Sequence, residues 1–129
     1  MQRLALVTLL VRDYDEAIAY YVGALGFILQ EDTMLSPAKR WVVVAPALES
    51  GGALLLAMAD NEAQRASLGR QTGGRVGFFL HTDNFIRDYT RMKAAGVDFL
   101  EEPRHEPYGT VVVFADLYGN RWDLLERKA

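Results

Sequence analysis

Two side chains stand out as able to do chemistry, the imidazole of His81 and the carboxylate of Asp123. A neutral imidazole can act as a general base or hydrogen-bond a ligand near neutral pH. Asp123 lies between two apolar residues of a predicted strand, so its side chain points away from theirs and must be paired or solvated. An acid–base or ligand-binding role is therefore predicted for both. Two alternatives stay open: His81 hydrogen-bonds backbone at a strand end, or Asp123 forms a structural salt bridge with Arg75 or Arg121.

Further polar and aromatic residues could bind a ligand without reacting with it. Arg75 and Arg40 are candidate anchors for an anionic or carbonyl group, because a guanidinium presents a planar fork of donors. For Arg40 the favoured interpretation is a solvated charge at a strand edge. Trp41 is either buried packing or a ring that stacks on a ligand. Tyr108 either covers the mouth of a pocket or packs in a turn.

The strand predicted over Val76–Thr82 must position His81. Side chains alternate between the two faces of a strand. One set is uniformly apolar and suits packing under a helix: Val76, Phe78 and Leu80. The other set combines a charged residue, a glycine without a side chain, an aromatic ring and an imidazole, which is typical of a pocket lining. These residues are Arg75, Gly77, Phe79 and His81. Phe79 is expected to form an apolar wall, and Gly77 is expected to leave a void beside it.

The sequence contains two tandem copies of one module. Sliding the sequence along itself so that Asp13 meets Asp83 also aligns Gly26 with Gly96, with no gap. Each half is predicted to form a strand, a helix and three further strands. Each helix begins at the Asp as N-cap and ends at the Gly, which adopts the left-handed conformation without penalty. The predicted strands are 4–11, 27–32, 40–45 and 53–59 in the first half, and 76–82, 99–102, 110–115 and 121–126 in the second.

These elements predict a single α+β domain of two tandem βαβββ modules. The first module covers about 1–59, a connector with a short helix over Asn61–Leu68 covers about 60–74, and the second module covers about 75–129. Two such modules can place their helices on the outside and curve their mixed sheets around a shared groove.

Composition excludes several classes of protein. The 129 residues contain no cysteine, which excludes a disulfide framework, a thiol nucleophile and a zinc finger, and favours a cytoplasmic protein. The net charge of −3 provides no basic field for nucleic acid. The apolar run Leu4–Val11 is too short to span a membrane.

The doubled module carries three segments that resemble one superfamily. They are the helix that begins at Asp13-Tyr-Asp-Glu, the run Lys93-Ala-Ala-Gly96-Val97, and Asp116-Leu-Tyr-Gly-Asn120 followed by Trp122-Asp123-Leu124. The chain is identified by them as a member of the vicinal oxygen chelate superfamily, which includes glyoxalase I, bleomycin-resistance proteins, fosfomycin-resistance enzymes and extradiol dioxygenases. The resemblance implies the fold and a homodimer. It says little about activity, because metal enzymes and metal-free binding proteins share this scaffold.

The resemblance also implies four positions for the ligands of a divalent metal. They fall at Leu6, within Ala53–Leu56 with Leu56 favoured, at Gly77 and at Asp123. Only Asp123 offers a suitable donor atom, and shifting the register by a residue or two supplies no others. We therefore expect no metal and no other cofactor.

The sequence thus predicts a protein that binds a small organic molecule in the groove between apolar walls, formed by Leu6, Leu56 and Phe79. One alternative is a lyase or isomerase of the same superfamily that uses His81 and Asp123 as acid and base, or as ligands of a shifted metal site. Another is a purely structural dimer whose groove is vestigial. Whether any reaction is catalysed stays open.

Overall fold

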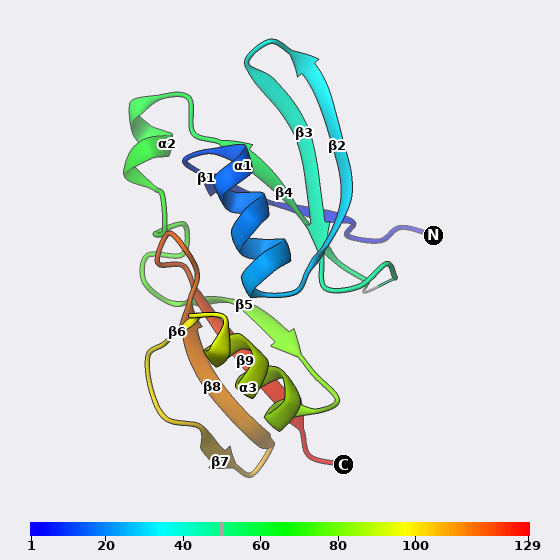
Figure 1. Cartoon of the computed structure of the whole chain (residues 1–129), viewed down its shortest axis with the longest axis vertical. Coiled ribbons are helices and arrows are strands. Elements are labelled where there is room, and N and C mark those ends of the chain that lie inside the picture. Colours follow the sequence, from blue (N-terminus) through cyan, green and yellow to red (C-terminus); the bar gives the residue numbers. More distant parts are fainter. Residues whose placement is uncertain (50) are drawn as a thin grey trace. The chain divides into compact units, whose positions relative to one another are not determined.

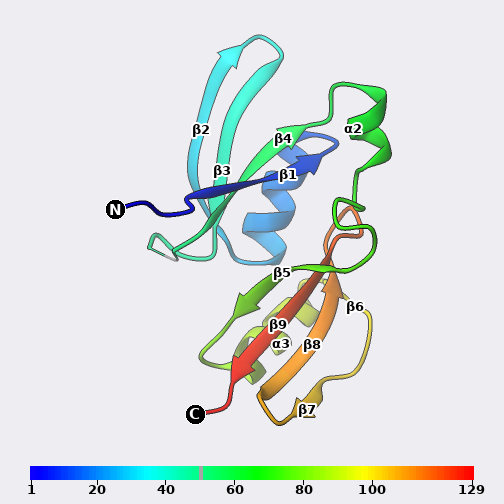
Figure 2. The same cartoon turned by 180° about the vertical axis from the view of Figure 1, so that it is seen from behind.

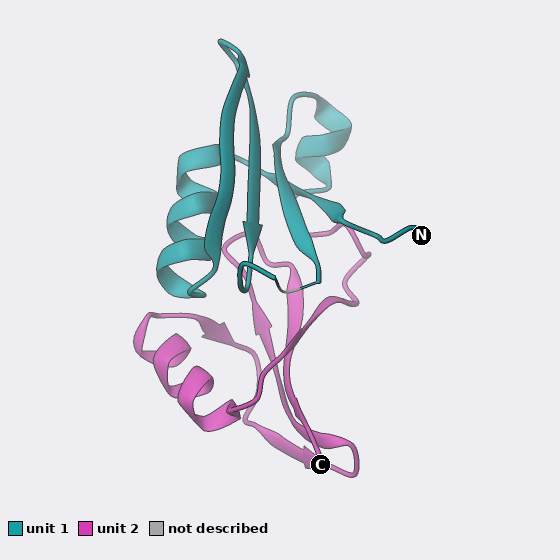
Figure 3. Ribbon diagram, turned by 90° about the vertical axis from the view of Figure 1, so that its right-hand side faces the viewer, with its two compact units in different colours: residues 1–68 teal, residues 69–129 magenta. Residues whose placement is uncertain are grey.

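The computed structural model describes residues 1–49 and 51–129 (Figure 1). It divides into two compact units, 1–68 and 69–129 (Figure 3). Each unit contains one mixed, curved sheet with a helix on one face, which confirms the predicted α+β class and the doubled module. The boundary between the units falls inside the predicted connector, whose short helix α2 (Glu62–Ala66) belongs to the first unit. The groove predicted between the halves concerns their relative placement and stays a prediction.

The first unit has a four-stranded sheet in the order β1-β4-β3-β2. β1 and β4 are parallel, and the other pairs are antiparallel. The strands are β1 (Leu6–Val11), β2 (Ile28–Ser36), β3 (Lys39–Ala45) and β4 (Ala53–Met58). The helix α1 (Tyr14–Ile18) continues as a π-helical turn, η1 (Ala19–Ala24).

Local signals place this helix as predicted. The Asp13 carboxylate accepts a hydrogen bond from the Glu16 amide at 2.8 Å and so caps the first turn. Tyr21 and Leu25 are buried against the sheet, and Gly26 ends the helix with a positive φ of 79°. In Figure 1 α1 lies in front of its sheet and in Figure 2 behind it, so one sheet face is covered by the helix. We call this the helix face of the sheet and the opposite side its open face.

The second unit has a sheet in the order β5-β9-β8-β6, with β7 also paired to β8. β5 and β9 are parallel, and the remaining pairs are antiparallel. The elements are β5 (Val76–His81), α3 (Phe85–Ala94), β6 (Asp98–Phe99), β7 (Arg104–Glu106), β8 (Gly109–Ala115) and β9 (Arg121–Arg127). The strand expected over 99–102 is thus shorter and earlier, and β7 forms in a segment where no strand was predicted.

An aromatic stack fills the helix face of this second sheet. The Trp122 ring stacks on Phe78 at 4.7 Å and on Phe114 at 5.8 Å between ring centroids. Phe99 packs edge-on against both Phe114 and Tyr89 of α3. These contacts identify the residues of β5, β8 and β9 that face the helix, and the alternate residues therefore face the open side.

The second helix is capped one residue later than predicted. The Asn84 side chain, not that of Asp83, accepts the capping hydrogen bond, from the Arg87 amide at 3.1 Å. The cause lies in β5, where Val76 pairs with Arg121 and Phe78 with Trp122, so that Gly77 is an extra residue in the strand. This bulge displaces the following helix by one position relative to the first module.

Among the described residues, no helix is long and apolar enough to cross a membrane.

Candidate functional site

The open face of the first sheet carries a hollow of about 570 Å³. Its apolar part is formed by Leu6, Trp41, Val43 and Ala53. Trp41 pairs with Thr33 across β2 and β3, and Val43 pairs with both Glu31 and Leu55, which sets these side chains on one face. Both Leu6 and Trp41 are half-buried, so their side chains remain accessible from the hollow. Of the predicted ligand-binding residues, these two are brought together.

A polar rim surrounds this hollow, and sequence reasoning did not identify it. It contains Arg3, Gln30, Glu31 and Glu49. The Gln30 amide donates hydrogen bonds to the backbone oxygens of Ala47 at 3.4 Å and Leu48 at 3.2 Å, which ties β2 to the loop that follows β3. The alternation of β2 could have placed Glu31 beside Val43, but the irregular pairing at Gln30 hides that register in the sequence.

Leu56 does not line the hollow. It pairs with Leu9 and Val42, and all three side chains are 0% exposed on the helix face. The expectation of an apolar wall at Leu56 is therefore wrong. The residue of β4 on the open face is Leu55, which pairs with Thr8 and Val43.

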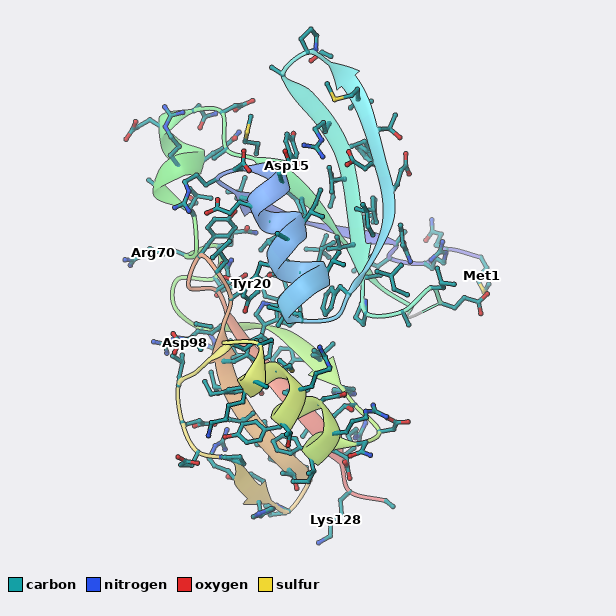
Figure 4. The ribbon with its side chains drawn as sticks, viewed as in Figure 1. Met1, Asp15, Tyr20, Arg70, Asp98 and Lys128 are labelled. Atoms are coloured by element: carbon teal, nitrogen blue, oxygen red, sulfur yellow. The ribbon has the colours of Figure 1, made fainter. Side chains whose placement is uncertain are left out.

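Arg40 forms ion pairs with two carboxylates of its own unit, and a role as ligand anchor stays a prediction. Its Nε and Nη2 atoms donate to the two carboxylate oxygens of Asp32 at 3.1 and 2.6 Å, and Nη1 donates to Asp15 at 2.9 Å. The guanidinium also lies 5.2 Å from the centre of the Tyr14 ring. The hydrogen bonds from Arg40 hold the pKa of Asp32 below its usual value. Arg40 thus clamps β2 and β3 to the first turn of α1, where Figure 4 labels Asp15.

The open face of the second sheet carries Phe79, His81 and Asp123. Phe79 pairs with Asp123, which in turn pairs with Val113, so these three form a row across the sheet. Phe79 is 63% exposed, and His81 is exposed one pleat further along β5. The strand alternation predicted these faces, and His81 does not lie under the helix.

Asp123 has an unusual environment. Its Oδ1 atom is shut off from solvent and has no hydrogen-bond donor among the described residues. Burial raises the pKa of Asp123, the Arg104 charge opposes that rise and the Glu101 charge adds to it. The salt bridge to Arg75 or Arg121 that was left open as an alternative is absent from the described part of the chain, and no hydrogen bond joins Asp123 to His81.

A charged network lies beside Asp123, and sequence reasoning missed it. Arg104 donates from Nε to Glu101 and from Nη1 to Glu106, both at 2.9 Å. The Glu101 carboxylate also accepts a hydrogen bond from the backbone amide of Val113 at 3.1 Å. On this edge of β8, Val113 lies between the residues that pair with β6 and those that pair with β7, so neither strand pairs with it. The two-residue spacing of Arg104 and Glu106 was a signal of a strand, but the flanking prolines favoured a loop.

The void expected beside Gly77 is filled. A Cβ atom built on Gly77 would lie 2.5 Å from the methyl carbon of Thr72, so this methyl group occupies the place of the missing side chain. The Thr72 hydroxyl donates to the Arg75 carbonyl at 2.6 Å, which holds the connector against the strand. The prediction of a cavity there is therefore wrong.

The two remaining candidates lie at turns. Arg75 is exposed just before β5, and its guanidinium has no ion pair within the described residues. Tyr108 is exposed in the turn between β7 and β8, where its carbonyl accepts from the Lys128 amide at 2.9 Å and its hydroxyl interacts with Arg104. These contacts hold Tyr108 in the turn, and the alternative in which its ring covers a pocket mouth stays a prediction.

The four implied metal-ligand positions do not suit a divalent ion. Leu55 pairs with Val43 as Asp123 pairs with Val113, so the second position falls on Leu55 rather than Leu56, and neither is a donor. Within residues 1–49 and 51–129, no group of three or more His, Cys, Asp or Glu side chains is arranged to hold a metal ion. The donor set thus disagrees with a resident metal, whose absence stays a prediction.

Comparisons with known proteins agree with the fold. A family model described as the Glyoxalase/Bleomycin resistance protein/Dioxygenase superfamily matches residues 3–124. An uncharacterized protein from Shewanella frigidimarina is 52% identical over 97% of this chain and 93% of its own length. The crystal structure of UcmS2 has a TM-score of 0.83 at 34% identity and covers 97% of this chain and 98% of that one. The structure of TnmS3, an antibiotic binding protein from a Streptomyces species, has a TM-score of 0.78 at 26% identity and covers 99% and 98%.

Proposed function

Because this chain belongs to the Glyoxalase/Bleomycin resistance protein/Dioxygenase superfamily, we propose that it binds a small organic molecule on an open sheet face without the family's divalent metal. The similarity to TnmS3, which is described as an antibiotic binding protein, supports a binding role. The observation that carries the proposal is the hollow beside Trp41. Its volume of about 570 Å³ lies within the range of small-molecule sites, and it combines an aromatic wall with a polar rim.

The chemistry of the hollow favours a ligand with a flat apolar part. The Trp41 indole can stack on such a ring, while Leu6 and Val43 remove its edges from water. Arg3 and Glu31 at the rim can orient polar substituents. No step in this binding requires a metal ion.

The alternative of a lyase or isomerase has less support. An acid–base pair needs its two groups within hydrogen-bond reach of one substrate. His81 and Asp123 share a face of the second sheet, but no hydrogen bond orients one against the other, and neither lines the hollow that carries the proposal. A homodimer and a cytoplasmic location complete the proposal; the first follows from the family resemblance and the second from the cysteine-free sequence.

Tryptophan fluorescence tests the site directly, since Trp41 and Trp122 are the only two tryptophans. In a Trp122→Phe background, Trp41 is the sole reporter, and titration with anilinonaphthalene sulfonate is expected to quench it saturably. Leu6→Gln should weaken binding about tenfold, because it removes apolar contact. Leu4→Gln is the matched control, since Leu4 is 78% exposed and lies outside the hollow. Equal affinities of the two variants, or no quenching of Trp41, would contradict the proposed site.

A further inference from the structure

The carboxylate of Asp123 is incompletely satisfied by its own unit. Its Oδ1 atom is sealed from solvent without a donor among the described residues, and the side chain as a whole is only half-buried. The second oxygen, Oδ2, therefore reaches the open face. A carboxylate that has lost part of its hydration gains strongly from a hydrogen-bond donor that approaches the oxygen still accessible.

Arg104, whose charge acts on Asp123, does not supply that donor. Arg104 is committed to Glu101 and Glu106, with both hydrogen bonds at 2.9 Å. Asp123 is thus a third carboxylate beside one guanidinium, and within the described residues no ion pair joins it to Arg121, which lies on the same face two residues earlier in β9. The Glu101 charge adds to the rise of the Asp123 pKa.

An exposed aromatic ring completes the arrangement. Phe79 pairs with Asp123 in the neighbouring strand and is 63% exposed on the same face. The face of an aromatic ring attracts cations, and its apolar surface covers hydrocarbon. A ring and an accessible carboxylate side by side thus suit an organic cation better than a neutral or anionic molecule.

We infer that Asp123 selects a ligand that carries a protonated amine or a comparable cationic N–H group, with Phe79 packing on the apolar part next to that group. The inference goes beyond the proposed function, because it assigns a second ligand site, on the open face of the second sheet. The amine donates to Oδ2 of Asp123, and its charge is balanced by that carboxylate. A metal ion is a poor substitute, because Asp123 is the sole donor among the four positions that the family uses.

Three probes with one ring and different charge test this inference: naphthylmethylammonium, naphthylmethanol and naphthylacetate. Calorimetry on the full chain is expected to show the ammonium binding about tenfold more tightly than the alcohol, and the acetate most weakly. Asp123→Asn should bring the ammonium and the alcohol to within about twofold of each other. Asp98→Asn is the matched control, because Asp98 is exposed in β6 and should leave the preference intact (Figure 4).

A second variant keeps the test independent of folding at Asp123. Phe79→Leu changes an exposed side chain, and it should weaken the ammonium several-fold while an amide spectrum shows the fold unchanged. Shifts of the Phe79 and Val113 amides on ammonium binding locate the site. A charge preference that survives in Asp123→Asn, or no ammonium binding to the wild type, overturns the inference.

The two proposals fail separately. Quenching of Trp41 by anilinonaphthalene sulfonate without a preference dependent on Asp123 overturns this inference alone. An Asp123-dependent preference without a response of Trp41 overturns the site in the first unit and leaves this one standing. Loss of both results overturns both proposals.

Discussion

The turn between β8 and β9 depends on one buried carboxylate, that of Asp116. Its Oδ1 accepts from the amides of Tyr118 and Asn120, and its Oδ2 accepts from the Asn120 side-chain amide, each at 2.9 Å. Asp116 is 5% exposed and Asn120 is 4% exposed. Asp116→Ala removes every one of these acceptors and leaves two donors of Asn120 buried with no acceptor on residue 116.

The cost can be worked out from these contacts. A buried donor left without an acceptor costs about 1–3 kcal/mol, whereas the half-buried Tyr118 amide can turn to water at little cost. Relief of the desolvated Asp116 charge offsets part of the loss, so we expect a destabilisation of about 2–4 kcal/mol. This is a large part of the free energy of unfolding of an ordinary domain, which is about 5–15 kcal/mol.

Urea denaturation followed by tryptophan fluorescence measures this loss. In a Trp41→Phe background the signal comes from Trp122 alone, which follows the turn directly in β9. Asp98→Ala serves as the control, because its exposed side chain should contribute less than about 0.5 kcal/mol. If Asp116→Ala costs no more than this control, the three hydrogen bonds do not stabilise the turn and the reasoning is refuted.

Four further predictions concern stability, metal and assembly. Arg40→Ala should destabilise the first unit by about 1–2 kcal/mol in urea without changing probe binding at Trp41, since its three hydrogen bonds to Asp32 and Asp15 lie on the helix face. Arg87→Ala is the control, because it removes ion pairs of an exposed arginine with Asp83 and Asp88 and should change little. Equal losses in the two variants would contradict the clamp. Burial raises the pKa of Asp123 above 3.8, so the wild type loses stability as pH rises through the window between 3.8 and that raised value. Asp123→Asn should therefore be the more stable protein at neutral pH, with the difference closing below 3.8 in pH-dependent urea titrations; a constant difference would argue against the buried charge. Metal analysis after dialysis should find no stoichiometric zinc, nickel, manganese or iron, and one ion per chain would contradict this. Sedimentation at micromolar concentration should give about twice the mass of one chain, as the family resemblance implies, and a monomer mass would count against it.

Local sequence signals determined most of the fold. The cap of the first helix needs only Asp13 and the Glu16 amide three residues later, so reading neighbouring letters suffices. Alternation along β5 needs only the strand itself, and it placed Phe79 and His81 on the open face. The repeat of the module then extended the order of the elements to the other half.

Contacts between distant residues decided the site. Arg40 forms an ion pair with Asp15, which is 25 residues away in the sequence, and the residues around either one do not predict that contact. The bulge at Gly77 moved the second cap from Asp83 to Asn84, because an extra residue in a strand shows only against the strand it pairs with.

Contacts between distant strands also decide which residues line the open faces. Whether Leu55 or Leu56 faces the hollow depends on pairing with β1 and β3, since a shift of one residue exchanges the two faces of a strand. Asp123 was visible in the sequence as a carboxylate in an apolar run. Its unpaired oxygen depends on Arg104 being held by Glu101 and Glu106, an arrangement that only the packed tertiary structure creates.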